Sequence, residues 1–191
     1  MPIIRGTNYA DEIIGTSTAD DIYGYGGNDL IYGNGGDDII YGGAGNDDIF
    51  GGTGVNDLYG GTGADYFSMS ARGTGASDDF IADFEFDRDR VDVSAWGVSD
   101  ISQLRELLGT DANGDANFNA SYYGENHFVT IAGVSAAQLE ARDFIFDTGA
   151  ARNITGTARA DTLFGSRYND TINGAGGNDY LLGGNGADRL L

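Results

Sequence analysis

Residues 6–68 read, in units of nine, GTNYADEII, GTSTADDIY, GYGGNDLIY, GNGGDDIIY, GGAGNDDIF, GGTGVNDLY and GGTGADYFS. The same pattern returns at Gly156 with GTARADTLF, GSRYNDTIN, GAGGNDYLL and GGNGADRLL, and it runs to Leu191. The sixth position is Asp in ten of the eleven units, with Asn56 as the exception, and the eighth position is always apolar. Eleven copies in register indicate a repeat protein in which each unit is one small structural element.

Each unit has two halves with different backbone preferences. The first six residues are rich in Gly, which adopts the positive φ that tight turns need. The last three follow the pattern x-apolar-x, which favours a short strand with one inward side chain. One unit is then half a coil, and units n and n+2 stack. The sequence predicts a mainly β protein: a right-handed parallel β-roll (β-solenoid) of nonapeptide repeats with a small mixed α/β capping segment.

Stacking brings the sixth-position side chains of units n and n+2 face to face. Carboxylates about 5 Å apart repel each other by roughly 1 kcal/mol even at the dielectric constant of water. A hard divalent cation between successive turns would supply the counter-charge. Six to eight oxygen ligands in a flexible cage suit Ca²⁺ better than Mg²⁺, which demands octahedral geometry. The alternative is an ordinary β-solenoid in which Gly, Asn and Asp only build turns, but that does not explain why position six is Asp.

We therefore predict several calcium ions, up to about seven, one for each adjacent pair in a column. The predicted carboxylate ligands are Asp11, Asp20, Asp29, Asp38, Asp47, Asp65, Asp161, Asp170, Asp179 and Asp188. The predicted carbonyl ligands in the turns are those of Gly27, Gly36, Gly45, Gly54, Gly63, Gly177 and Gly186. Asn56 is a weaker candidate because it has lost a charge. The first two units of each block are also weaker, because their turns lack most of the glycines.

The composition excludes several classes of partner. The net charge is −20, and all ten basic residues are Arg. Nucleic acid binding needs a Lys/Arg patch, and so does binding to an anionic membrane surface. No stretch is long and apolar enough to span a membrane. There is no Cys, so disulfides contribute nothing to stability.

These units resemble the RTX family of hemolysin-type calcium-binding repeats, whose pattern is GGxGxDxUx. GGAGNDDIF at 42–50 matches every fixed position, and the resemblance covers 6–68 and 156–191. It implies a parallel β-roll with Ca²⁺ between the turns. It also implies a Gram-negative bacterial protein, secreted or on the cell surface, that uses type I secretion machinery through its parent protein and folds in external calcium. Because the array stops at Leu191, we expect the sequence to be a fragment.

The segment between the two repeat blocks breaks the nine-residue rhythm. We expect three parts: repeat block 1 at 1–68, a capping segment with strands and two short helices at 69–152, and repeat block 2 at 153–191. Within the capping segment we expect one helix around Leu104, a hairpin formed by 117–123 and 126–132, and a second helix after Ser135. The loop 111–117 is similar to the start of an EF-hand loop, which makes Asp111 and Asp115 weak candidate ligands. It lacks the Gly and Glu of that motif, so a plain turn is the favoured interpretation.

Catalysis is not indicated by any residue. His127 is the single His, and a packed or exposed strand residue is its favoured interpretation. The ninth positions carry an outward ladder of large side chains: Ile14, Tyr23, Tyr32, Tyr41, Phe50 and Tyr59. One interpretation is a face covered by 69–152, which we favour. The other is a platform for polysaccharide or a protein partner, as in an R-module beside a mannuronan epimerase domain or in an adhesin.

Overall fold

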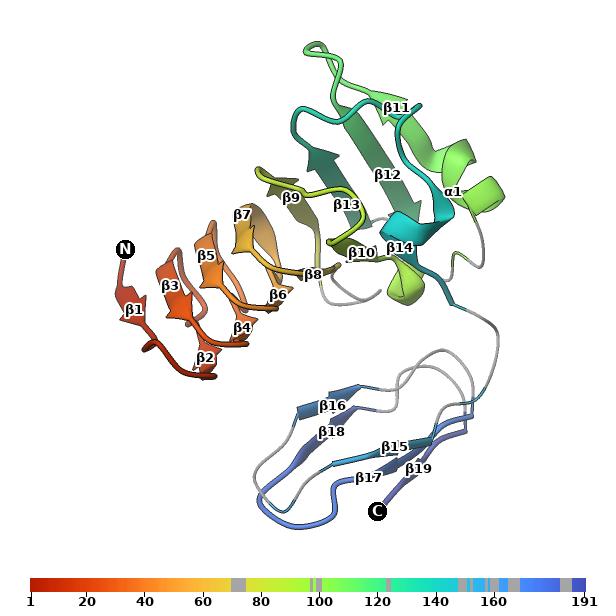
Figure 1. Ribbon diagram of the computed structural model, residues 1–191. Helices are drawn as coiled ribbons and strands as arrows, with labels where there is room; N and C mark the ends of the chain where they lie inside the picture. Colours follow the sequence, from red (N-terminus) through yellow and green to blue (C-terminus); the bar gives the residue numbers. More distant parts are fainter. Residues whose placement is uncertain are drawn as a thin grey trace.

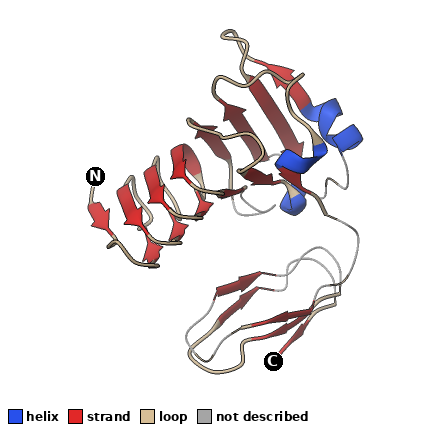
Figure 2. Ribbon diagram, viewed as in Figure 1, coloured by secondary structure: helices blue, strands red, loops and turns tan. Residues whose placement is uncertain are grey.

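A computed structural model gives the structure of the protein. It describes residues 1–69, 75–96, 98, 101–122, 125–147, 151, 153–156, 158, 162–164, 169–182 and 187–191. Most regular elements are short parallel strands, and the helical turns lie in the segment that follows the first repeat block (Figures 1 and 2). The prediction of a mainly β fold with parallel sheets is confirmed.

Two sheets share the first repeat block, with alternate strands in each. The strands of the first sheet are β1 (Ile3–Arg5), β3 (Asp21–Gly26), β5 (Ile39–Ala44) and β7 (Gly54–Thr62). The strands of the second are β2 (Glu12–Ile14), β4 (Leu30–Tyr32), β6 (Asp48–Phe50) and β8 (Tyr66–Ser68). Ile22 pairs with Ile40, and Ile31 with Ile49, so one coil takes two nonapeptides, as predicted.

The core of the roll is a double ladder of eighth-position side chains. Ile22, Ile40 and Leu58 from one sheet and Ile31, Ile49 and Phe67 from the other are all fully buried. Full burial of one such side chain stabilises the fold by about 1.5–3 kcal/mol. The invariant apolar residue of each unit therefore supplies the packing that the Gly-rich turns cannot supply.

Both sheets continue beyond residue 68 into the middle segment. Strand β9 (Ser77–Ile81) pairs with β7, and β10 (Arg90–Asp92) pairs with β8, in both cases parallel. Strands β13 (Glu125–Ile131) and β14 (Phe144–Ile145) add one further strand to each sheet. The expected boundary between residues 68 and 69 thus lies inside two continuous sheets (Figure 1).

An antiparallel hairpin ends the parallel stacking. Strand β12 (Ala116–Tyr122) runs antiparallel to β13, as predicted for a hairpin there, and β11 (Leu108–Thr110) follows at the sheet edge. The expected helix around Leu104 is α1 (Ile101–Leu107), and two short 3-10 helices are η1 (Ser94–Trp96) and η2 (Ala141–Asp143). The second expected helix, after Ser135, is a turn, and helical geometry begins only at Ala141.

The second repeat block repeats the two-sheet pattern on a smaller scale. Its first sheet consists of β15 (Asn153–Thr155), β17 (Thr171–Asn173) and β19 (Arg189–Leu190). Its second consists of β16 (Thr162–Phe164) and β18 (Tyr180–Leu182). The register again advances by two nonapeptides, from Ile172 to Leu190 and from Leu163 to Leu181.

Candidate metal centres between the turns

The sixth-position aspartates lie where each turn ends and the next strand begins. Asp29, Asp38, Asp47 and Asp65 are each 2% exposed or less. The register of the strands that follow them sets each one above the aspartate of the previous coil. The two predicted columns, one starting at Asp11 and the other at Asp20, are therefore present.

One carboxylate oxygen of these aspartates accepts a hydrogen bond from the backbone of the preceding coil, 18 residues earlier. The backbone N–H of Asp29 donates to Oδ1 of Asp47 at 2.9 Å, and the N–H of Asp47 donates to Oδ1 of Asp65 at 2.9 Å. Bonds of the same kind join Asp11 to Asp29, Asp20 to Asp38, and Asp170 to Asp188. Half of the hydrogen-bonding capacity of these carboxylates is thus committed to holding the stack in register.

The second oxygen of the same carboxylates is buried without a hydrogen-bond partner. This holds for Oδ2 of Asp29, Asp38, Asp47 and Asp65. A buried polar atom without a partner costs about 1–3 kcal/mol, and a charged one costs more. Four such atoms in neighbouring turns are a recurrent feature of the repeat, and a cation is the partner that would remove the cost.

The first glycine of each turn lets oxygens from two turns approach each other. A β-carbon on Gly24 would lie 2.4 Å from Oδ2 of Asp29 and 2.3 Å from the carbonyl oxygen of Gly42, one coil on. For Gly33 the corresponding distances are 2.6 Å to Asp38 and 2.3 Å to the carbonyl oxygen of Gly51. Carbonyls of first-position glycines therefore converge with the carboxylates, although the repeat pattern did not predict them as ligands.

Fourth-position carbonyls, which were predicted from the repeat as calcium ligands, point toward the fourth position of the next coil. A β-carbon on Gly45 would lie 1.8 Å from the oxygen of Gly27, and one on Gly63 would lie 1.8 Å from the oxygen of Gly45. The backbone at Gly27, Gly45 and Gly63 has φ between +112° and +147°, a region that favours glycine. Positive φ is also found at the other described glycines in the fourth position, namely Gly36, Gly54 and Gly177, whereas Gly186 lies outside the described residues.

Electrostatics show how poorly the buried carboxylates tolerate charge. Burial, reinforced by repulsion from Asp20, raises the pKa of Asp38 to about 6. Burial likewise raises the pKa of Asp47 to about 6, with repulsion from Asp29. The pKa of Asp65 rises to about 7 through burial and repulsion from Asp89, Asp47 and Asp83. These groups would ionise readily only beside a positive charge.

The donors in these turns fit a hard cation. Among the described residues, no group of three or more His, Asp or Glu side chains could hold a metal ion. Each candidate centre therefore has two stacked carboxylates, and its remaining ligands would be backbone carbonyls. An all-oxygen set of this kind suits Ca²⁺.

The first two turns differ from the glycine-rich turns. Oδ2 of Asp11 accepts hydrogen bonds from the backbone N–H and the hydroxyl of Thr7, at 2.6 and 2.8 Å. Oδ2 of Asp20 accepts from the same two groups of Thr16, at 2.6 and 2.9 Å. These carboxylates cap their own turns, which gives a physical reason for the expectation that the Gly-Thr units are weaker cation sites.

Two aspartates that extend the columns were missed in the sequence analysis. Asp89 continues the first column, since its Oδ1 accepts the N–H of Asp65 at 3.0 Å. Asp79 lies opposite Asn56 in the β7–β9 register and extends the second column. Both precede an apolar residue by two positions, Ile81 and Val91, as every sixth-position Asp does, and that shorter signal could have revealed them.

In the second block, three of the four predicted aspartates can be placed. Asp170 is buried, and Asp179 and Asp188 are partly buried. A β-carbon on Gly174 would lie 2.3 Å from Oδ2 of Asp179, which repeats the glycine–aspartate fit of the first block. Asp161 lies outside the described residues.

Two other predicted candidates have structural roles. Oδ1 of Asp111 accepts the backbone N–H groups of Asn113 and Asp115, and Oδ1 of Asp115 accepts that of Gly133. These bonds lower the pKa of Asp111 and make the loop a hydrogen-bonded turn.

The single histidine is packed inside the middle segment. His127 is 2% exposed, and its Nδ1 lies 3.0 Å from Oγ of Ser77.

The predicted aromatic ladder is split between the outer faces of the two sheets. Tyr23, Tyr41 and Tyr59 stack on the first sheet, with ring centroids 5.1 and 4.6 Å apart. Tyr32 and Phe50 stack on the second at 4.7 Å. The strands of the middle segment extend the sheet edges instead of lying over these side chains, contrary to the expected cover.

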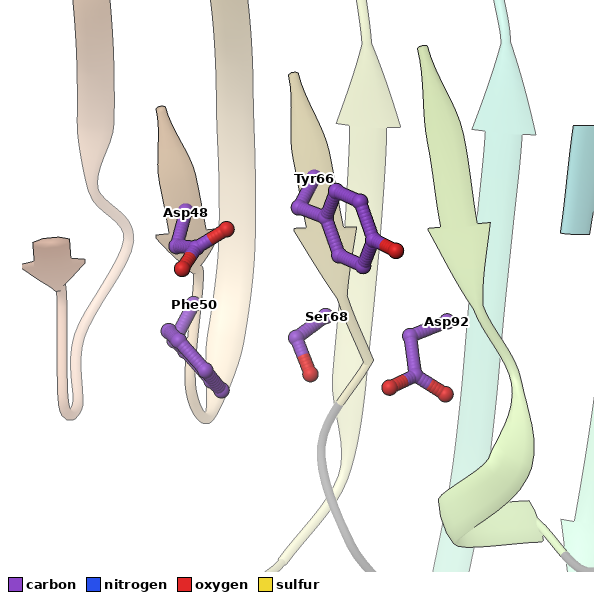
Figure 3. Close-up of a pocket in the computed structure, with 5 residues that line it drawn as sticks. All are labelled: Asp48, Phe50, Tyr66, Ser68 and Asp92. Carbon is purple, nitrogen blue, oxygen red and sulfur yellow. The ribbon is translucent and has the colours of Figure 1, made fainter. Parts of the chain in front are cut away.

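A shallow hollow lies beside the second aromatic row. It is lined by Asp48, Phe50, Tyr66, Ser68 and Asp92, which project from β6, β8 and β10 (Figure 3). Burial raises the pKa of Asp48. The hollow thus combines aromatic rings with two carboxylates and a hydroxyl.

Comparison with known proteins agrees with these features. The model of the RTX calcium-binding nonapeptide repeat matches residues 5–40, 32–67 and 155–190. No curated protein sequence is similar enough to match. None of the helices in the described residues is long and apolar enough to cross a membrane.

Two solved structures that match come from the mannuronan C5-epimerase of Azotobacter vinelandii. The AlgE6R2 subunit is 27% identical, with 78% of this chain and 95% of that chain covered and a TM-score of 0.39. The AlgE6R3 subunit is 28% identical, with 76% and 83% covered and a TM-score of 0.33. The family match spans just over half of the 191 residues and coincides with the stacked aspartate turns, so the chain belongs to the family that carries the RTX calcium-binding nonapeptide repeat.

Proposed function

We propose that this chain is a non-catalytic module that folds when Ca²⁺ binds between its stacked turns. The observation that carries the proposal is the set of buried Oδ2 atoms without partners on Asp29, Asp38, Asp47 and Asp65. Calcium would be held by these carboxylates and by turn carbonyls. Ca²⁺ supplies the positive charge that makes their ionisation compatible with burial.

The free energy of calcium binding at such sites also contributes to the free energy of folding. The two turns that contribute to one site come together only in the folded roll, so the ion binds the native state and not the unfolded chain. A ligand present at 100 times its dissociation constant stabilises the native state by about 2.7 kcal/mol per site. Several sites in one roll would therefore decide between the folded and unfolded states.

This coupling suits a module of a larger secreted protein. We infer that the roll is poorly folded where free calcium is scarce, as inside a cell, and folds outside, in support of the stability and export of its parent protein. Family membership supports this proposal. The parent protein would be exported by type I secretion.

Far-ultraviolet circular dichroism of calcium-free protein tests the folding role. We expect β-structure to appear on titration with CaCl₂ and not with equimolar MgCl₂, because Mg²⁺ retains its water shell. Unchanged β-structure after complete removal of calcium would refute the proposal. Equal effects of the two ions would point to charge screening instead of specific sites.

A second candidate function is binding of a neutral glycan on the outer face of the second sheet. The observation in its favour is the hollow beside the Tyr32–Phe50 stack, where aromatic rings lie next to the carboxylates of Asp48 and Asp92 (Figure 3). Sugar rings pack on aromatic faces, and carboxylates accept hydrogen bonds from sugar hydroxyls. The same carboxylates repel anionic glycans.

Isothermal titration of the calcium-loaded protein tests this candidate. We expect heat with a neutral oligosaccharide and a loss of that heat in Asp92→Asn with Tyr66→Ala. Asp57→Asn with Tyr59→Ala, on the other sheet, is the matched control. Heat with alginate alone would assign anionic glycan binding elsewhere, and no heat with either glycan would end the glycan hypothesis.

A further inference from the structure

The amide of Asn56 bridges two neighbours within its column. Its Nδ2 donates to Oδ1 of Asp79 at 2.7 Å, and its Oδ1 accepts the backbone N–H of Asp38 at 3.1 Å. The donor on one side and the carboxylate on the other fix which way the amide points. Asn56 is fully buried, so these two bonds are made away from water.

The amide nitrogen lies where the other turns have a carboxylate oxygen. A β-carbon on Gly51, the first residue of this turn, would lie 2.9 Å from Nδ2 of Asn56. In the turns that end in Asp38, Asp47 and Asp65, the corresponding β-carbon would lie 2.6, 2.5 and 2.5 Å from Oδ2. The turn that ends at Asn56 therefore presents an N–H donor at the place where its neighbours present an unpartnered acceptor. An amide nitrogen has no lone pair available for a cation.

Asp79 is the last carboxylate of this column. It is fully buried, and the next strand sets Val129 opposite it. Its Oδ1 accepts the Asn56 amide, which places a donor beside a carboxylate that the fold has removed from water. The other oxygen of Asp79, Oδ2, is buried without a hydrogen-bond partner, so the bond to the Asn56 amide is what offsets the burial of this carboxylate.

We propose that Asn56 takes the place of a calcium ion at the junction between the repeat block and the strands that follow it. The inference rests on the proposed calcium-dependent folding of the other turns. The column that ends at Asp79 is then closed by a hydrogen bond that needs no metal, whereas the column that runs from Asp11 to Asp89 is acidic throughout. One edge of the junction stays linked when calcium is low.

The test is Asn56→Asp, with Asn46→Asp as the matched control. Both substitutions add the same charge, but Asn46 is an exposed fifth-position residue whose Oδ1 accepts the N–H of Ala64. Asp37 already fills the equivalent place one unit earlier and accepts the N–H of Val55, so an acid is tolerated there. Bound calcium would be counted by equilibrium dialysis with atomic absorption, and melting temperatures measured in calcium-free and saturating buffers.

We expect N56D to melt lower than N46D without calcium, to bind one more calcium ion per chain than the wild type, and to recover its stability when saturated. Equal ion counts and equal calcium-free melting temperatures in the two variants would overturn the inference. If N56D fails to fold in either buffer, Asp79→Asn decides, since we expect the wild-type ion count there, and the loss of an ion would overturn the inference. A wild type that binds no calcium would refute the proposed function itself.

Discussion

A β-carbon on Gly42 would lie 2.5 Å from Oδ2 of Asp47, so the first and sixth residues of this turn fit against each other with no room for a side chain on the glycine. The carbonyl oxygen of Gly60, one coil on, would lie 2.8 Å from the same β-carbon. The glycine thus leaves open the space in which a carboxylate and a carbonyl from adjacent coils approach each other.

Gly42→Ala should therefore weaken both the fold and the affinity for calcium. Overpacking of this kind costs about 1–3 kcal/mol in the free energy of unfolding, and the added methyl group displaces Asp47 from its neighbours. Thermal melting and calcium titration measure the two effects. Gly26→Ala is the control, because a β-carbon there would lie 3.6 Å from its nearest neighbour, in ordinary contact. Equal losses in the two variants would contradict the prediction.

Asp47→Asn should have opposite effects with and without calcium. Without calcium the variant should melt higher than the wild type, because a buried carboxylate repelled by Asp29 has become neutral. With saturating calcium it should bind at least one ion fewer and melt lower. Asp37→Asn, an exposed residue whose Oδ1 accepts the N–H of Val55, should change neither quantity. A uniform decrease in both buffers would indicate a packing defect instead.

Calcium-free protein should lose stability as the pH rises from about 4 to 7. The unfolded aspartates titrate near pH 4. Burial raises the pKa of Asp47 to about 6 and that of Asp65 to about 7. In this window the native state binds more protons than the unfolded state, so the free energy of unfolding falls with pH. Above about pH 7 the loss is complete.

Melting curves at pH 5 and pH 8 measure this effect. The curves should be recorded in 1 M salt, where the Debye length is about 3 Å. The exposed charges are then screened, and the remaining pH dependence comes from the buried carboxylates. The gain in melting temperature from calcium should be larger at pH 8, because protons compete with the cation at pH 5. A calcium-free melting temperature that rises from pH 5 to pH 8 would disprove this account.

Ala175→Gly should stabilise the second repeat block whether or not calcium is present. Ala175 has φ of +66°, in the left-handed region that costs a residue with a β-carbon roughly 1–2 kcal/mol. Glycine removes that cost and loses about 0.5–1 kcal/mol through its freer unfolded chain, so the net gain should be up to about 1.5 kcal/mol. Hydrogen exchange of the 169–182 amides would report it. Ala64→Gly in the first repeat block, where φ is not left-handed, should give no gain in melting temperature.

The nine-residue period was enough to predict the fold and the columns, because Asp and Ile recur at fixed places and the coil length follows from them. The pairing of Ile22 with Ile40 needs no other information. The carboxylates that ended each column could not be predicted in this way. Asp79 and Asp89 follow segments of irregular length, so they do not lie at the nine-residue spacing of the repeat.

The role of the amide at position 56 was also beyond the sequence. Loss of a charge predicted a weaker site, but the bond to Asp79 depends on a strand that pairs 23 residues further along the chain. The carbonyls of first-position glycines were missed for a related reason. Carbonyl direction depends on the sign of φ at successive residues, and a repeat pattern does not give it.

The bonds along the aspartate columns run one way, since the N–H of each sixth-position residue donates to the carboxylate one coil further along the chain. A ladder of this kind has two unlike ends. Its N-terminal side presents carboxylate oxygens, such as Oδ1 of Asp20, and its C-terminal side presents backbone N–H donors. A capping element that satisfies one end of the roll would therefore not satisfy the other.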